Sequence, residues 1–216
     1  MKIPKIIHLV WFGGERPKLF DGLVKKIKEI NFDYEIIEWN DSNINFELLN
    51  SELFNKCENL GAKSDIFRFE VLYKYGGVYM DYDFIQVKKF DDILNFDFFV
   101  GCPFSAEHEV WNSIVGSTKE NIICYEFLKG LSNTNPLLRW EINRVMSETG
   151  PYYLQKIFDE NKDKTNSKKF IGNYFFPFPA VERNKIKNLN DDDIKYSLSF
   201  IDDTTYCVHL HTTTWQ

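Results

Sequence analysis

Residues 64–83, SDIFRFEVLYKYGGVYMDYD, constrain the fold more than any other part of the chain. The segment begins with the apolar spacing of an amphipathic helix, breaks at Gly76-Gly77, runs through three apolar or aromatic residues and ends on Asp81-Tyr82-Asp83. Two glycines allow a tight turn from a helix into a short buried strand, so the segment reads as an α/β unit. Side chains two positions apart on a strand point to the same side, so Asp81 and Asp83 can face one ligand. Paired carboxylates suit a hard divalent cation such as Mn2+ or Mg2+.

The residues before this segment predict alternating strands and helices. Apolar spacing and turn residues give, in order, a buried, central, parallel strand at 5–12, a helix at 17–30, a strand at 34–39, a turn and helix start at 40–43 and a short helix at 46–54. Such alternation is typical of an α/β sheet with crossover helices. Ligands of these sheets bind at the carboxyl ends of the strands, which are expected at 11–13, 39–41 and 81–83.

The rest of the chain predicts more strands and helices and no linker. In order, the sequence indicates a strand at 96–101, a segment at 109–131 that opens with Val110-Trp111 and continues as a helix, two helical stretches within 137–158 separated by Thr149-Gly150-Pro151, a solvated loop at 161–169, a ring-rich segment at 174–179, an acidic loop at 188–193 and a last short strand at 206–211. No internal repeat is visible. We therefore expect a single domain over residues 1–216.

Charge and cysteine usage exclude some classes of protein. The 216-residue chain has a formal net charge of −6, whereas general nucleic-acid binding needs a basic surface. Its four cysteines are far apart and form no CxxC pair, which indicates buried thiols rather than a disulfide framework or a zinc site. No signal peptide or membrane-spanning run is recognisable, so a cytoplasmic protein is expected. Peripheral contact at the inner membrane face, through the basic residues of 162–169, stays open beside the simpler explanation of a solvated loop.

Five more residues could carry chemistry, and each has a structural alternative. Asp65 and Arg68 share one helix face, either as a surface ion pair or as a sugar-hydroxyl and a phosphate ligand. Trp11 closes the first strand, and its ring could fill the core or stack on a nucleobase. His209 and His211 would point the same way on a strand. They are either a hydrogen-bonded pair, or one of them completes the metal site or contacts a diphosphate.

Four blocks of sequence together resemble glycosyltransferase family 32. They are IPKIIHLVWFGG near the N-terminus, residues 64–83, the TGP at 149–151, and HLHTTTW near the C-terminus. This DXD-containing group includes yeast-type α-1,6-mannosyltransferases and bacterial capsular and lipopolysaccharide transferases. More distantly, the chain is similar to the glucosyltransferase domains of the large clostridial toxins. The resemblance extends from Ile3 to Trp215.

The resemblance implies a GT-A fold, the Rossmann-like nucleotide-diphospho-sugar transferase fold, with a mostly parallel central sheet flanked by helices. It also implies a role for each matching residue. Trp11 would stack on the base, Asn43 would help hold the donor, Asp65 and Arg68 would bind the donor sugar and diphosphate with Tyr79 beside them, Asp81 would contact ribose or sugar and metal-bound water, and Asp83 would ligate the metal directly.

The C-terminal block carries the remaining expectations. His209 stands where the family usually has a His six residues before its closing Trp, which is Trp215 here, and we expect it and His211 at the metal. Thr214 replaces the family's Ser and keeps a hydroxyl at the donor site, where Trp215 is also expected. His211 stands where the family often has an apolar or aromatic residue.

The expected function is metal-dependent, retaining transfer of a hexose from a nucleotide-diphosphate sugar, with UDP favoured and Mn2+ or Mg2+ as cofactor. The acceptor would be a hydroxyl of a glycan or a lipid-linked glycan, as in polysaccharide biosynthesis. No nucleophile for double displacement is evident, which favours front-face transfer. The alternatives are a protein-modifying transferase, a nucleotide-sugar hydrolase, or a non-enzymatic module that binds nucleotide sugars.

Overall fold

The computed structural model describes residues 2–103, 109–131 and 142–212. A central six-stranded sheet has the order β2-β1-β3-β6-β5-β7. Its strands are β1 Ile6–Val10, β2 Glu35–Trp39, β3 Gly77–Met80, β5 Phe98–Cys102, β6 Trp111–Ser117 and β7 Ser167–Ile171. Only β6 runs antiparallel to its neighbours, so the predicted mostly parallel α/β sheet is confirmed. A second, two-stranded sheet pairs β4 Phe84–Gln86 with β8 Cys207–His209.

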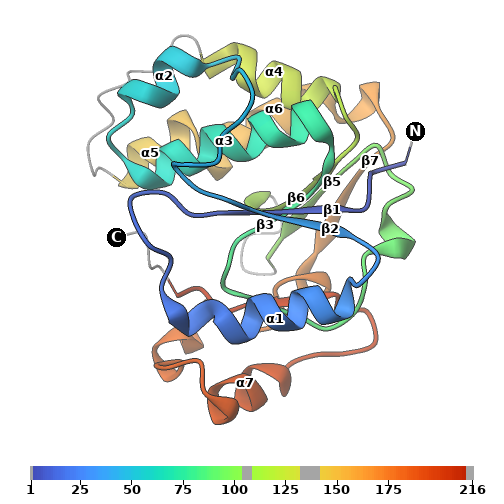
Figure 1. Cartoon of the computed structure of the whole chain (residues 1–216). Helices are drawn as coiled ribbons and strands as arrows, with labels where there is room; N and C mark the ends of the chain where they lie inside the picture. The colour runs from blue at the N-terminus through green and yellow to red at the C-terminus, as the bar shows by residue number, and fades with distance from the viewer. Residues whose placement is uncertain (1, 104–108, 132–141, 213–216) are drawn as a thin grey trace.

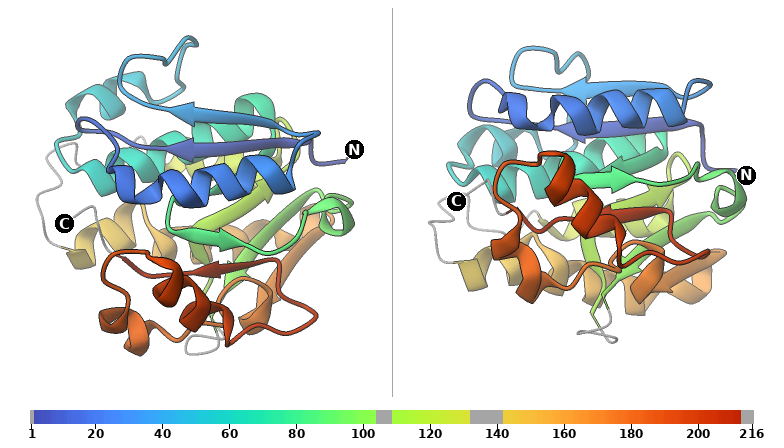
Figure 2. Two further views of the ribbon diagram at one scale, coloured as in Figure 1. Left: turned by 60° about the horizontal axis from the view of Figure 1, so that its bottom comes forward. Right: turned by 90° about the horizontal axis from the view of Figure 1, so that it is seen from below.

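Helices cover both faces of the central sheet (Figure 1). One face carries α2 Ser51–Lys56, α3 Leu60–Tyr75, α4 Ile122–Gly130, α5 Ile142–Glu148 and α6 Pro151–Asn161. The other face carries α1 Asp21–Ile30 and the β4–β8 sheet, with α7 Asp191–Leu198 beyond them (Figure 2). The short 3-10 helices are η1 Lys18–Phe20, η2 Asp91–Ile93, η5 Lys162–Lys164, η6 Gly172–Tyr174 and η7 Ala180–Lys185.

The central strands are apolar on both sides because each side packs on its own core. In β1, Ile7 and Leu9 join the core under α1, while Val10 joins the core under α3. In β3, Val78 and Tyr79 divide between the two cores in the same way. Burial on both faces explains why the sequence shows continuous apolar runs here rather than alternation.

Helix α3 and strand β3 form the unit that residues 64–83 predict. The Asn59 side chain accepts from the Ala62 backbone N–H at the start of α3, and the helix ends at Gly76, whose φ is 67°. Gly77 follows with φ 106°, and a Cβ there would lie 2.6 Å from the Ile6 carbonyl oxygen, so the turn requires glycine. The predicted amphipathic pattern is wrong, because α3 is buried without a break from Asp65 to Leu72.

The other differences from the sequence predictions have identifiable causes. No helix starts at 40–43 or at 46, because Asn43 bonds back to the Glu38 carbonyl and the Asn40 N–H and closes a turn; α2 begins at Ser51. The sequence pattern of 109–131 does not predict strand β6, because Gly116 interrupts the pattern where the Phe99 ring packs. The predicted loop at 161–169 contains η5 and the start of edge strand β7, and the predicted acidic loop contains the first turn of α7.

Two expectations about the whole chain can be compared with the structure. All four cysteines are buried thiols, as predicted. Among the helices of residues 2–103, 109–131 and 142–212, none has the length and apolar character needed to cross a membrane.

Candidate active site

A cavity of about 530 Å³ opens at the carboxyl ends of β1 and β3. Residues 10–13 and 81–83 line it, which confirms two of the three expected strand ends. The third, at 39–41, is where β2 ends as expected, but Trp39 is buried in the core and residues 39–41 do not line the cavity. Since β6 runs antiparallel, its first residues, 111–113, reach the same edge, and the Ser113 carbonyl accepts from the Asp81 N–H at 2.9 Å.

Asp81, Asp83 and His209 form a group that could hold a metal ion. One ligand atom from each lies within 4.8 Å of the others. Strand β3 ends at Met80, so both carboxylates lie just beyond it. Phe84 of β4 pairs with His209 of β8, and this pairing brings the imidazole to the carboxylates. His209 Nε2 lies 3.1 Å from Asp83 Oδ1.

The second oxygen of Asp83 is held by the backbone that follows β8. It accepts hydrogen bonds from the Thr212 N–H at 2.8 Å and from the Thr212 hydroxyl at 3.0 Å. Burial alone would raise the pKa of Asp83, but His209 and Thr212 outweigh it and lower the pKa well below the usual range. Burial likewise opposes a charged His209, yet the Asp83 carboxylate raises the pKa of the imidazole. Asp83 is therefore ionised across the physiological range.

The predicted assignment of His211 to the metal site finds no support in the geometry. His211 stays outside the group of three, and its Nε2 lies 3.3 Å from the Phe178 carbonyl oxygen. Its ring packs against His209, with 4.3 Å between the ring centroids. Burial is the main reason why the pKa of His211 falls to about 3, so its imidazole is neutral.

Asp65 and Arg68 make a buried pair, so the alternative of a surface ion pair is wrong. Their side chains are 9% and 7% exposed, and Arg68 Nη2 lies 3.1 Å from Asp65 Oδ1. Arg68 also lies 3.8 Å from Asp81 Oδ1 and 4.4 Å above the Tyr79 ring. The Tyr79 hydroxyl donates to Asp81 Oδ1 at 2.5 Å. The helix pair and Asp81 therefore belong to one continuous network.

Two residues that sequence analysis assigned no role hold Asp65 in place. Asn112 Nδ2 donates to Asp65 Oδ1 at 2.8 Å, and the Thr149 hydroxyl donates to Asp65 Oδ2 at 3.1 Å. The Asn112 carbonyl in turn accepts from Arg68 Nη1 at 2.6 Å. Burial raises the pKa of Asp65 to about 6 in spite of these contacts. The TGP block at 149–151 could have identified Thr149 from the sequence. No sequence pattern identifies Asn112, because strand β6, which positions it, is not predicted.

The four remaining residues predicted to bind the donor differ in their placement. Trp11 lines the cavity and packs against Phe20 and Tyr82 at centroid distances of 5.9 and 6.2 Å, so it serves the core and the cavity together. Asn43 does not line the cavity and is exposed in its turn. Thr214 and Trp215 lie outside the described residues.

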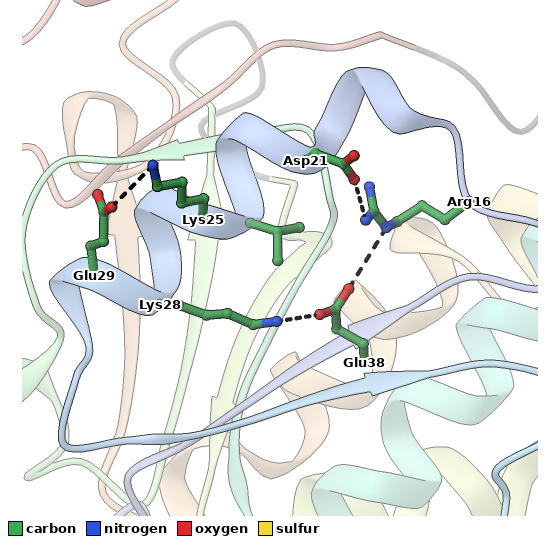
Figure 3. Close-up of a pocket in the computed structure, with 7 residues that line it drawn as sticks. Arg16, Asp21, Lys25, Lys28, Glu29 and Glu38 are labelled. Carbon is green, nitrogen blue, oxygen red and sulfur yellow. Dashed lines mark hydrogen bonds and ion pairs between the residues drawn. The ribbon is translucent and has the colours of Figure 1, made fainter.

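A charged depression between α1 and β2 offers no second site (Figure 3). Its six charged side chains pair with one another: Arg16 with Asp21 and Glu38, Lys28 with Glu38, and Lys25 with Glu29. Glu38 also accepts from the Tyr82 hydroxyl at 3.3 Å, and Arg16 lies 5.1 Å above the Tyr82 ring. These contacts fix the tyrosine between the two DXD carboxylates.

Comparison with known proteins agrees with this geometry. Residues 17–100 match the family described as "Glycosyltransferase sugar-binding region containing DXD motif". An inositol phosphoceramide mannosyltransferase of Schizosaccharomyces pombe is 26% identical over 162 residues, 72% of this chain. The match covers 45% of the length of that yeast protein. These findings confirm the resemblance to DXD-containing glycosyltransferases.

Solved structures show the same fold. The PaToxG glycosyltransferase has a TM-score of 0.61 and 24% identity, covering 74% of this chain and 70% of its own. The UDP-bound glycosyltransferase domain of the YGT toxin has a TM-score of 0.57 and 12% identity, covering 92% of this chain and 89% of its own. The predicted GT-A fold is thereby confirmed.

Proposed function

We propose, from the premise that residues 17–100 form the DXD-containing sugar-binding region of a glycosyltransferase, that this protein transfers a hexose from a nucleotide-diphosphate sugar to a hydroxyl of a glycan or glycolipid. The observation that carries the proposal is the convergence of Asp81, Asp83 and His209 at the cavity that also contains Asp65 and Arg68. A relic that only bound sugars would not need this buried, charged network, which is costly to maintain without a function.

The residues present fit a divalent cation. Asp81, Asp83 and His209 would hold it, and when bound it would neutralise charge on the diphosphate leaving group. Two carboxylates and one imidazole suit Mn2+ better than Mg2+, which prefers oxygen ligands throughout. Asp65, Asp81 and Asp83 together carry more negative charge than Arg68 balances when His209 is neutral, as a metal ligand must be, which is a second reason to expect a cation here.

The chain's own residues position the donor. Arg68 spreads its positive charge between Asp65 and Asp81, and both carboxylates keep free oxygen lone pairs for sugar hydroxyls. Tyr79 and Asn112 prevent the network from rearranging, because each bonds a carboxylate from a rigid strand. UDP is the favoured nucleotide, supported by the UDP-bound toxin domain of the same fold.

We infer retention of the anomeric configuration by front-face transfer. Glu15 lines the cavity as an exposed carboxylate. The other three described carboxylates that line it are each committed: Asp65 to Asn112, Thr149 and Arg68, Asp81 to Tyr79, and Asp83 to Thr212 and His209. None is thereby set up as a nucleophile, so the departing phosphate would accept the acceptor's proton. A covalent glycosyl-enzyme trapped on an Asp or Glu would overturn this mechanism.

The acceptor is proposed from the cavity wall and from the relatives. Leu60, Val145, Met146 and Pro151 give part of the wall an apolar surface beside the charged end. An amphiphilic acceptor such as a glycolipid matches this division, and the yeast relative is named for a ceramide substrate. The apolar residues would contact the lipid side of such an acceptor.

The test is donor binding and turnover in an Asp83→Asn variant. With Mn2+ and a panel of UDP- and GDP-sugars, we expect a thermal shift with one donor in the wild type and none in the variant, and at least a 100-fold loss of transfer because a metal ligand is gone. Asp92→Asn, an exposed carboxamide change away from the cavity, is the matched control. Failure of every donor to bind would refute the proposal; release of free sugar alone, with acceptors present, would make the protein a hydrolase.

A further inference from the structure

Tyr82 is the middle residue of the DXD turn, the segment of residues 81–83 that follows β3. Its side chain is buried, lines the cavity and packs against the Trp11 ring with 6.2 Å between the centroids. The hydroxyl donates to Glu38 Oε2 at 3.3 Å. Because its backbone connects Asp81 directly to Asp83, a displacement of Tyr82 would also displace the two carboxylates. The shape of the turn therefore depends on the contacts that hold this tyrosine.

Glu38 is the carboxylate that ties this tyrosine to the rest of the fold. It belongs to β2, and its side chain is partly buried. Its Oε1 pairs with Lys28 of α1 at 2.6 Å, and its Oε2, which accepts from Tyr82, lies 3.7 Å from Arg16 Nε (Figure 3). Arg16 in turn pairs with Asp21 at 2.6 Å and lies 5.1 Å above the Tyr82 ring. Both oxygens of Glu38 are thus held in place where the tyrosine hydroxyl meets them.

The same end of β2 also holds the rim of the cavity. Gly13 lines the cavity, and its backbone N–H donates to Asp41 Oδ2 at 2.8 Å. The φ angles of 81° at Gly13 and 126° at Gly14 are ones that glycine adopts readily, so the local sequence restricts this segment little. Arg16 ends the segment and is held by Glu38. Two contacts from the end of β2 therefore fix the rim at both of its ends.

The precision of such contacts matters for a metal site. Ligands that are already in place bind an ion more tightly than ligands that must first be ordered, and the partners behind them contribute about tenfold or more to the affinity. We propose that Glu38, which does not itself line the cavity, is a positioning residue that holds the DXD turn through Tyr82 and thereby sets the affinity for a divalent cation. The inference rests on the proposed function, because it concerns the ion that Asp81, Asp83 and His209 would hold.

Mn2+ binding by three variants tests the role of Glu38. Calorimetry with Mn2+ alone, without nucleotide or acceptor, makes the measurement independent of turnover. Glu38→Ala removes the carboxylate, and Tyr82→Phe removes the hydroxyl while keeping the ring. We expect each to raise the Kd for Mn2+ about tenfold. Glu38→Gln keeps an oxygen that can accept from the hydroxyl, so it should retain most of the affinity.

The opposite end of β2 provides a matched control. Tyr34, which precedes the strand, donates to Asp91 Oδ1 at 2.9 Å, and Lys5 pairs with the same oxygen at 2.8 Å. None of these three residues lines the cavity. Tyr34→Phe therefore removes the same kind of hydrogen bond and should lower the melting temperature about as much as Tyr82→Phe, but it should leave the Kd for Mn2+ unchanged.

The outcomes separate this inference from the proposed function. Mn2+ binding that is lost in Asp83→Asn but unchanged in Glu38→Ala and Tyr82→Phe would keep the metal site and overturn the positioning role. An equal rise of the Kd in Tyr34→Phe would reduce the effect to general destabilisation and overturn it as well. A rise in Glu38→Ala without one in Tyr82→Phe would overturn the route through the tyrosine. If the wild type binds no Mn2+, the metal site and its positioning residue are both refuted.

Discussion

His8 shows how a single buried side chain ties the site's scaffold together. Trp39 Nε1 donates to His8 Nδ1 at 3.0 Å, so the proton of the neutral ring is on Nε2, which donates to the Gly76 carbonyl at 2.8 Å. The ring thus joins β1 and β2 to the turn between α3 and β3. Burial lowers the pKa of His8 to about 4.

We predict that His8 makes the protein lose stability in mild acid. Between its unfolded pKa near 6.5 and its folded pKa of about 4, only the unfolded chain binds the proton. The neutral His8 ring therefore contributes its full stabilisation above pH 6.5, and the free energy of unfolding should fall by about 2 kcal/mol by pH 5. Urea unfolding at pH 7.5 and pH 5 would measure it. Since other groups titrate in this range, His8→Gln, which keeps a donor and an acceptor but does not titrate, is the reference; an equal loss in that variant would contradict the assignment.

Thr149 should act as a positioning residue through Asp65. Thr149→Val keeps the shape but removes the hydroxyl that donates to Asp65 Oδ2, so we expect kcat/KM for transfer to fall about tenfold, as for one hydrogen bond to a charged group. Thr149→Ser should restore most of the activity. Donor titrations of both variants, with melting temperatures as the folding control, check this; equal activity of the Val and Ser variants would rule the hydrogen bond out.

At the scale of elements, Glu70 fastens the loop before α2 to α3. Its buried carboxylate accepts from the Leu49 N–H at 2.9 Å and the Asn50 N–H at 2.8 Å, and Asn50 Nδ2 reaches the Leu128 carbonyl of α4 at 3.0 Å. In Glu70→Gln one backbone N–H would face an amide N–H, so the free energy of unfolding should fall by about 2 kcal/mol. Urea unfolding would show it, with exposed Glu52→Gln as the control; amide exchange at Leu49 and Asn50 should rise in the Glu70 variant alone.

The sequence predicts best those elements that are determined by their own residues rather than by neighbouring strands. The α3–β3 unit follows from two glycines whose positive φ angles no other residue adopts easily, and β1 follows from its apolar run. Strand β6 does not follow from its own residues. Its formation depends on pairing with β3 and β5 and on Gly116, which leaves room for the Phe99 ring. The same limit applies to the site. Asp81 and Asp83 are recognisable from their spacing, whereas Asn112, Trp111 and Ser113 acquire a position only once β6 is placed.

At the scale of the whole molecule, the site joins parts of the chain that are distant in sequence. Asp83 leads into β4, and His209 ends β8, the last strand of the described chain. The Leu210 N–H also donates to the Asp83 carbonyl at 3.0 Å, and Thr212 bonds the Asp83 carboxylate. Among the described strands only β4 pairs with β8, because their sheet has two strands. The C-terminal segment therefore depends on the DXD turn for much of its attachment.

A bound cation should consequently stabilise the molecule and its C-terminal segment most of all. At a Mn2+ concentration of 100 times the Kd, binding to the folded state alone adds about 2.7 kcal/mol. For a domain of this size that corresponds to a rise in Tm of about 5–10 °C. Amide exchange should slow at Val208, His209 and Leu210 more than in β1, because the ion would link Asp81 and Asp83 to His209 directly. EDTA should reverse both effects, and Asp83→Asn should abolish them while Asp92→Asn does not. Slowing spread evenly over the sheet, or retained in Asp83→Asn, would show that Mn2+ binds somewhere other than these three residues.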